Sequence, residues 1–164
     1  MKFPFHVIPQ NNDEVFMLEA LKEAWKAFLA NEVPIGAVLV KNGGIVAKGF
    51  NQVEMLQDAT AHAEMLCLTA GEASVGNWRL TDMILYCTME PCSMCAGAMF
   101  LTRIKKLVWG APDLRHGANG SWVDLFKNRH AIHQIEVQPY VLQEPCALIL
   151  RDFFQMQRNK KVNQ

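Results

Sequence analysis

The chain has 164 residues, a formal net charge of +0, and a composition that is 51% hydrophobic and 20% charged. This length and composition predict one folded domain over residues 1–164 with an ordinary hydrophobic core. Membrane helices are not expected, because no stretch approaches the roughly 18 apolar residues that a spanning helix needs. The first residues also lack the apolar core of a signal peptide, so we expect a cytoplasmic protein.

The predicted helices and strands alternate along the chain. Met17 and Leu21 belong to a run of apolar residues at helical spacing, and Asn42-Gly43-Gly44 marks a turn between two apolar runs. Loops are expected over 51–61 and 110–120. In chain order, the predicted elements are a helix at about 13–31, strands at 34–40 and 45–49, a helix at about 61–72, a strand at 83–88, a helix at 91–101, strands at 104–109 and 135–141, and a C-terminal helix at about 144–158.

This order of elements predicts the fold class. Strands separated by helices favour a mainly parallel sheet that is covered by helices on both faces. The hairpin at 34–49 adds antiparallel pairing to this sheet. We therefore expect an α/β protein, with a mixed five-stranded sheet in a three-layer α/β/α sandwich.

The five cysteines are an odd number, and two of them form a Cys-x-x-Cys pair. This pattern disfavours a secreted disulfide framework. The other three, Cys67, Cys87 and Cys146, stand in apolar surroundings, and we interpret them as core residues because a free cysteine behaves as a small hydrophobic side chain.

Charge is distributed unevenly between the two parts of the chain. Residues 1–102 hold 6 Lys+Arg and 11 Asp+Glu, a net charge of −5, whereas residues 103–164 hold 10 and 5, a net charge of +5. Such asymmetry can mark a face that binds a polyanion, although basic residues scattered over the surface would give the same count.

The most informative motif is His62-Ala63-Glu64, which is followed 27 residues after the glutamate by Pro91-Cys92-Ser93-Met94-Cys95. Three good zinc ligands, His62, Cys92 and Cys95, leave a tetrahedral metal with an open position for water, which is typical of a catalytic site. The carboxylate beside them can move protons. This order of residues is the known signature of zinc-dependent nucleobase deaminases.

The motif coincides with two predicted helix starts. Cys92 and Cys95 stand three residues apart, so both thiolates can lie on one face of a helix whose N-terminus favours their negative charge. His62 opens another helix after a loop. Two helix starts at one edge of an open α/β sheet can bring these ligands to a single metal ion.

Other interpretations of these residues remain open from the sequence. The Cys-x-x-Cys pair could be a redox pair. A structural zinc site would need a fourth ligand, for which His116, His130, His133, Cys67 and Cys87 are candidates by type, but none has ligand-like spacing to the set. Glu64 could be an ordinary surface residue, although its position next to a ligand favours a general acid/base.

Beyond these motifs, the chain resembles the family of bacterial tRNA-specific adenosine deaminases over nearly its whole length. The zinc motifs fit the wider cytidine-deaminase-like superfamily, whereas the loop at 110–121 and the helix with Phe153-Phe154 are specific to the tRNA enzymes. The resemblance rests on these segments: 32–38, the Asn51 loop, 60–64, 90–99, 110–113, 117–121 and 152–156.

The resemblance implies a fold, an activity and partners. The fold would be that of cytidine deaminases, with one zinc ion per subunit held by His62, Cys92 and Cys95. Zinc-bound hydroxide would attack C6 of the wobble adenosine of a tRNA anticodon, and Glu64 would shuttle protons while ammonia leaves and inosine remains. The family is homodimeric, and the anticodon stem-loop reaches both subunits.

The resemblance also implies substrate contacts, residue by residue. The alternatives are a turn residue at Asn51 and plain strand-edge packing at 33–35. The implied contacts are a hydrogen bond from Asn51 to the nucleoside, the Ala63 backbone N–H at the base edge, Val33, Pro34 and Ile35 as pocket walls, Asp113 at the flipped nucleotide, Phe154 stacked on flanking RNA, and Arg158 at a phosphate.

The chain departs from the family pattern at its expected RNA edge. Pro112, Gln155 and Gln157 stand where relatives tend to carry basic residues. This edge should therefore be less basic than usual. The helix and basic tail at about 144–164 border the same edge, and the residues that could compensate are Lys127, Arg129, Arg158, Lys160 and Lys161.

Two rival functions share parts of this pattern. A deaminase of free cytosine or guanine compounds would use the same zinc chemistry, but it has no need of the 110–121 loop or the Phe153-Phe154 helix. An RNA-binding module with a relict zinc site would be expected to have lost the carboxylate of Glu64, which is intact.

Overall fold

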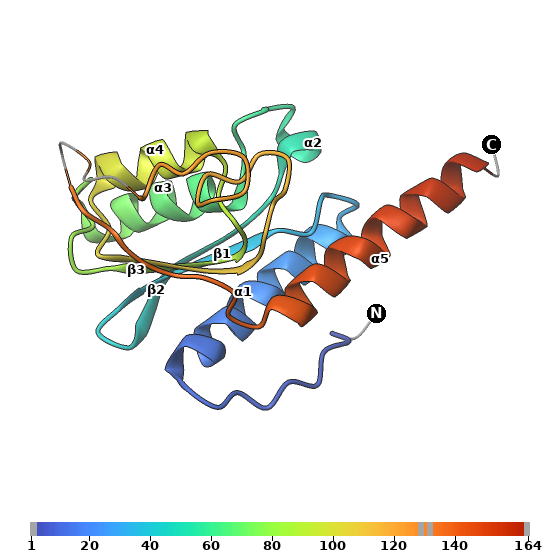
Figure 1. Ribbon diagram of the computed structural model, residues 1–164, viewed down its shortest axis with the longest axis horizontal. Helices are drawn as coiled ribbons and strands as arrows, with labels where there is room; N and C mark the ends of the chain where they lie inside the picture. Colours follow the sequence, from blue (N-terminus) through green and yellow to red (C-terminus); the bar gives the residue numbers. More distant parts are fainter. Residues whose placement is uncertain (1–2, 128–129, 131–132, 163–164) are drawn as a thin grey trace.

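The computed structural model describes residues 3–127, 130 and 133–162, and it places a five-stranded sheet between two layers of helices (Figure 1). The strand order is β2-β1-β3-β4-β5. The strands are β1 (Gly36–Lys41), β2 (Gly44–Phe50), β3 (Ile84–Met89), β4 (Lys106–Ala111) and β5 (Glu136–Gln138). The helices are α1 (Asn12–Leu29), α2 (Val53–Leu56), α3 (Ala63–Val75), α4 (Ser93–Thr102) and α5 (Gln143–Val162).

The sheet is mixed, as predicted. β1 is antiparallel to both β2 and β3, whereas β3, β4 and β5 pair in parallel. Four strands therefore run in one direction and β1 runs against them, so the pairings divide equally between the two types. The expectation of a mainly parallel sheet holds for strand direction but not for pairing.

Helices α3 and α4 cover one face of the sheet, and α1 and α5 cover the other (Figure 1). Side chains alternate between the two faces along each strand. Leu39, Leu85 and Leu107 therefore pack under α3 and α4, whereas Val38 and Val108 pack against α1 and α5. This alternation explains why the strands read as continuous apolar runs in the sequence.

Two glycines let α1 and α3 lie so close to the sheet that the backbone of each helix contacts the backbone of a strand. A Cβ atom at Gly36 would lie 2.1 Å from the carbonyl oxygen of Ala20 in α1, and one at Gly49 would lie 2.6 Å from that of Ala63 in α3. Any side chain at these positions would push the helices outward. The start of α3, which carries the predicted metal ligand, is thereby pressed onto β2.

Three elements differ from the sequence-based expectations. A short helix, α2, lies within the segment predicted as loop, where the buried carboxylate of Glu32 accepts a hydrogen bond from the Met55 N–H at 2.6 Å. β5 is shorter than predicted, because Tyr140 and Leu142 have positive φ angles of 64° and 51° that end the extended run. α5 continues to Val162, several residues past the predicted end.

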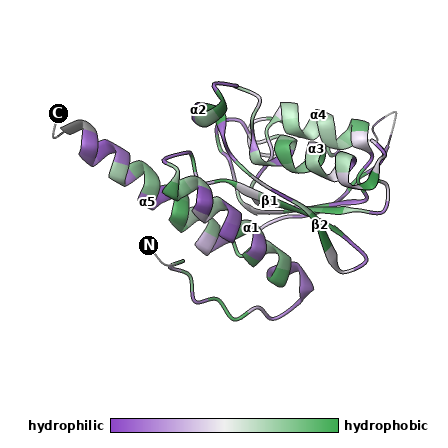
Figure 2. Cartoon of the chain, turned by 180° about the vertical axis from the view of Figure 1, so that it is seen from behind, coloured by the Kyte–Doolittle hydropathy of each residue, from purple (hydrophilic) through white to green (hydrophobic). Residues whose placement is uncertain are grey.

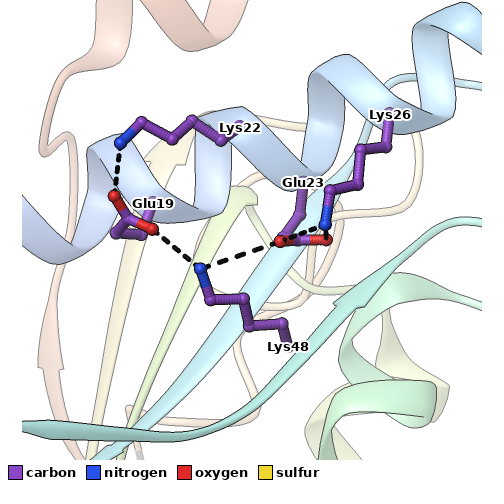
Figure 3. A network of polar contacts seen from close by, with 5 residues as sticks. All are labelled: Glu19, Lys22, Glu23, Lys26 and Lys48. Carbon is purple, nitrogen blue, oxygen red and sulfur yellow. Dashed lines mark hydrogen bonds and ion pairs between the residues drawn. The ribbon is translucent and has the colours of Figure 1, made fainter.

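A network of charges ties α1 to β2 (Figure 3). The Lys48 ammonium on β2 lies 2.7 Å from Glu19 Oε2 and 3.9 Å from Glu23 Oε1 on α1. Partial burial alone would raise the pKa of Glu19, but the Lys22 and Lys48 ammonium groups hold it below its ordinary value. The folded state therefore favours the ionised form of this carboxyl group.

Replacing Lys48 with methionine is expected to lower the free energy of unfolding by up to about 1 kcal/mol at pH 7, the usual limit for an exposed ion pair. Because the pKa of Glu19 is depressed in the folded protein, the contribution of the pair is present above the unfolded pKa and is lost as the pH falls through the folded pKa. Urea unfolding at pH 7 and pH 3 should show a smaller difference at pH 3. Lys41→Met is the control, since its partner Asp82 is exposed and 3.8 Å away; an equal loss in both variants would contradict the assignment.

Within the described residues, no helix is long and apolar enough to cross a membrane. Figure 2 shows that α3 and α4 are largely hydrophobic, whereas hydrophilic residues recur along α5. The far end of α5 extends beyond the sheet (Figure 1), so its polar residues lie away from the core.

Candidate active site

Three predicted ligands meet where α3 and α4 begin. His62 is the N-cap residue of α3, Cys92 is the N-cap residue of α4, and Cys95 lies in the first turn of α4. His62 Nδ1 is 3.6 Å from each sulfur atom, and the two sulfur atoms are 3.7 Å apart. No fourth His, Cys, Asp or Glu joins this group in the part of the chain that the structure describes. Three ligands around one point leave a tetrahedral metal with an open position.

The chemistry of this donor set fits zinc. One nitrogen and two sulfur atoms are the ligands that zinc prefers, and two helix N-termini favour thiolate charge. The hydrogen bond with Cys95, followed by that with His62, lowers the pKa of the Cys92 thiol to about 3. The same sulfur–sulfur hydrogen bond raises the pKa of Cys95. Deprotonation of Cys92 is therefore favoured, and the thiolate is the form of cysteine that binds zinc.

Glu64 lies in the first turn of α3, beside His62, and its residue is only 4% exposed. Burial raises the pKa of its carboxyl group to about 7. A bound cation nearby would favour the carboxylate form. A buried carboxyl group that can be either protonated or ionised near neutral pH is suited to general acid/base work.

A cavity of about 1000 Å³ opens over this group. Most of the predicted site residues line it, although they come from six separate segments of the chain. Pro34 and Ala63 are buried and do not line the cavity, and Cys95 lies behind Cys92. The predicted residues that line it are Val33, Ile35, Asn51, His62, Glu64, Cys92, Asp113, Phe154 and Arg158.

Glu32 is a cavity residue whose role the sequence did not reveal. Its carboxylate is 1% exposed and accepts a hydrogen bond from Asn51 Nδ2 at 3.1 Å. Because a carboxylate can only accept, this contact fixes the orientation of the Asn51 amide and leaves its Oδ1 as a free acceptor. Glu32 had been noted only as part of the family segment 32–38.

Glu90 is the second such residue, and it precedes the Pro91-Cys92 pair directly. Its buried carboxylate accepts hydrogen bonds from the backbone N–H groups of Asp113, Asn119 and Ser121 at 3.1, 2.8 and 3.2 Å, and from the Ser121 hydroxyl. A Cβ atom at Gly117 would lie 2.3 Å from this carboxylate, so glycine is required there. Glu90 thereby joins the loop at 112–121 to the ligand-bearing segment.

The other candidate ligands do not join the three-ligand group within the described residues, although His116 lines the cavity. Cys67 and Cys87 are buried free thiols, as is Cys146, which agrees with their predicted core positions. His116 Nδ1 is 3.5 Å from Asp113, and His133 is hydrogen-bonded to the carbonyl oxygen of Ile104. Of the basic residues expected to compensate at the RNA edge, Arg129 and the side chain of Lys161 lie outside the described parts.

Comparisons with known proteins agree with this geometry. The family model of the cytidine and deoxycytidylate deaminase zinc-binding region matches residues 10–111. The tRNA-specific adenosine deaminase of Bacillus subtilis is 48% identical over 149 residues, which cover 91% of this chain and 92% of that protein. The chain belongs to the tRNA-specific adenosine deaminase family. The predicted resemblance is thereby confirmed, and so is zinc as the cofactor that this family and this donor set share.

Further comparisons find similar proteins in a plant and among solved structures. The chloroplastic tRNA(adenine(34)) deaminase of Arabidopsis thaliana is 47% identical over 160 residues, but the chain spans only 12% of its length. A solved structure from a study of A-to-I editing by tRNA:A34 deaminases has a TM-score of 0.79 and 40% identity, covering 83% of this chain and 99% of that one. A guanine deaminase from Nitrosomonas europaea has a TM-score of 0.76 at 21% identity, which shows the fold alone.

Proposed function

We propose that the chain deaminates adenosine to inosine at the wobble position of a tRNA anticodon. The observation that carries this proposal is the 48% identity to a tRNA-specific adenosine deaminase over nearly the full length of both chains. The site has the parts that hydrolytic deamination requires, namely a three-ligand metal group with an open position and a buried carboxyl group next to it.

The chemistry divides between the metal and Glu64. When bound by His62, Cys92 and Cys95, zinc would act as a Lewis acid and lower the pKa of a water molecule in the open position. Glu64 would take one proton from that water and give it to the adenine ring nitrogen as the C6–O bond forms. It would then take the second proton of the same oxygen and give it to the C6 amino group, which leaves as ammonia when the C6–N bond breaks. The burial of Glu64 limits proton exchange with bulk solvent.

The cavity provides the groups that would hold the target nucleoside. Asn51 Oδ1, left free by the contact with Glu32, accepts a hydrogen bond from the nucleoside. Val33 and Ile35 form an apolar wall of the cavity. Ala63 does not line the cavity, but its backbone N–H has no helical acceptor in the first turn of α3 and is the group proposed for the base edge. An adenosine reaches such a cavity from a single-stranded loop, where it can leave the stack at low cost.

Contacts to the rest of the anticodon arm come from the cavity rim. Asp113 contacts the flipped nucleotide, Phe154 stacks on flanking RNA, and Arg158 binds a phosphate. The net charge of +5 over residues 103–164 supports a polyanionic substrate. We further propose, on the same family grounds, that the protein is a homodimer that acts in the cytoplasm.

The rival activity is deamination of free guanine or cytosine compounds. The guanine deaminase has the same fold, so the fold itself is compatible with a small free base as substrate. The 21% identity between the two chains carries no statement about the substrate of this one. Incubation with small molecules therefore belongs in the test.

Mass spectrometry of nucleosides tests the proposal. The zinc-loaded protein is incubated with an anticodon stem-loop that carries a wobble adenosine, and in parallel with a mixture of cytidine and guanine. We expect inosine from the stem-loop and no change in the mixture. Uridine or xanthine from the mixture, without inosine from the RNA, would contradict the tRNA substrate and keep only the deaminase chemistry.

A further inference from the structure

Three large apolar side chains stand exposed on the rim of the cavity. Leu114 is 81% exposed, Trp122 is 62% exposed and Phe154 is 45% exposed, and all three line the cavity above the metal ligands. Single exposed apolar residues are common on protein surfaces, but several around one functional cavity mark an interaction site. The sequence had assigned a role to Phe154 alone, and Trp122 stood outside every motif.

Trp122 differs from the other tryptophans of the chain. Trp25 and Trp109 are buried, and Trp109 donates its indole N–H to Asn119 Oδ1 at 2.8 Å. Trp78 is 49% exposed, but the Arg79 guanidinium covers its ring at 4.0 Å. Within the described residues, the Trp122 ring has no aromatic or cationic partner, and its indole N–H has no acceptor. One face of a large π system is therefore available for a ligand.

The backbone that carries this ring is held in place by hydrogen bonds. The N–H of Trp122 and that of Val123 both donate to the carbonyl oxygen of Gly117, at 2.9 and 3.2 Å. Ser121, directly before Trp122, is anchored to the buried Glu90 carboxylate by two hydrogen bonds. The turn is thus tied to the same segment that carries Cys92. A backbone that is already held in place reduces the freedom that is lost when a ligand stacks on the side chain.

Charge on the rim favours nucleic acid over an apolar partner. Arg115 and Arg158 line the same cavity, and neither guanidinium has a carboxylate partner in an ion pair among the described residues. Unpaired cations next to an exposed aromatic face are the usual means of binding single-stranded RNA, with phosphates on the cations and bases on the ring.

We propose that Trp122 is a stacking platform for the unpaired base next to the target adenosine. When the target adenosine rotates into the cavity, it no longer stacks on the neighbouring base of the anticodon loop. One face of that neighbouring base is then exposed at the cavity rim, where Trp122 lies. This contact offsets part of the lost stacking and compensates for the reduced basic charge at Pro112, Gln155 and Gln157. The inference rests on the proposed function, because it takes anticodon-loop RNA as the substrate.

The test measures kcat and KM for inosine formation on the anticodon stem-loop with the zinc-loaded protein. Trp122→Leu should raise KM roughly tenfold, in the range of a lost base–aromatic stack, and should leave kcat within about twofold. Trp78→Leu is the matched control, since it removes an equally large exposed ring on another loop, and its KM should not change. Thermal unfolding of both variants verifies that they are folded.

A change in the RNA identifies the stacked partner. Replacing one neighbour of the wobble adenosine by an abasic nucleotide should raise the KM of the wild-type protein roughly tenfold and that of Trp122→Leu by less than about twofold, because the contact is already lost. Inosine formation with an unchanged KM for Trp122→Leu would overturn this inference while the proposed function stands. A wild-type protein that forms no inosine would overturn both. A fall in molecular mass of Trp122→Leu in sedimentation would make Trp122 a subunit contact instead.

Discussion

Replacing Glu64 with glutamine is expected to lower kcat for adenosine deamination by about 10²- to 10⁴-fold, the usual contribution of general acid/base catalysis. Glutamine keeps the shape of the side chain but cannot take up or release a proton. The protein should still bind one zinc ion, because Glu64 does not belong to the three-ligand group. Single-turnover inosine formation and metal analysis of the same sample measure both quantities.

The control for this variant is Glu72→Gln, which makes the same chemical change near the opposite end of α3. Its kcat and zinc content should equal those of the wild-type protein. If Glu64→Gln kept full activity, the proton carrier would be another group. If it lost zinc together with activity, the role of Glu64 would be to support the metal site and not to move protons.

Replacing Glu90 with glutamine is expected to have the second largest effect. Glutamine would set an amide N–H₂ group against backbone N–H donors that now meet a carboxylate. An unsatisfied buried donor costs about 1–3 kcal/mol, so the loop at 112–121 should loosen. We expect KM for the stem-loop to rise by about tenfold or more, since this loop carries Asp113 to the cavity and leads directly to Trp122.

Gly117→Ala disturbs the same contact from the other side, because its Cβ atom would meet the Glu90 carboxylate at 2.3 Å. It should therefore raise KM in the same way, and the two substitutions combined should cost less than the sum of their separate effects. Steady-state kinetics with the stem-loop measure the split between KM and kcat. A fall in kcat at unchanged KM would show that Glu90 acts on the metal segment and not on the loop.

The tertiary structure explains why the role of Glu64 is easier to predict from the sequence than the roles of Glu90 and Glu32. Glu64 stands two positions after a ligand, and the role proposed for it follows from that spacing alone. Glu90 and Glu32 act on backbone and amide groups that lie 19 to 31 residues away in the chain. Nothing local distinguishes such a carboxylate from a surface residue, because its partners become neighbours only after folding.

The sequence by itself determined the family, the three residues of the zinc group and the order of nearly all helices and strands, and it suggested Glu64 as the proton carrier. These features depend on local spacing and on apolar periodicity, which a chain carries before it folds. Through the resemblance to tRNA-specific adenosine deaminases, it also predicted site residues of which most line the cavity.

The tertiary structure decided what depends on distant contacts. It made a helix of the α2 segment by hydrogen-bonding Glu32 to Met55, and it shortened β5 through the positive φ angles near Tyr140. It left Trp122 uncovered at the rim of the cavity, although the residue looks like any other apolar residue in the sequence. Burial, hydrogen-bond satisfaction and exposure are properties of the packed chain, so these residues acquired their roles only when segments far apart in the sequence came together.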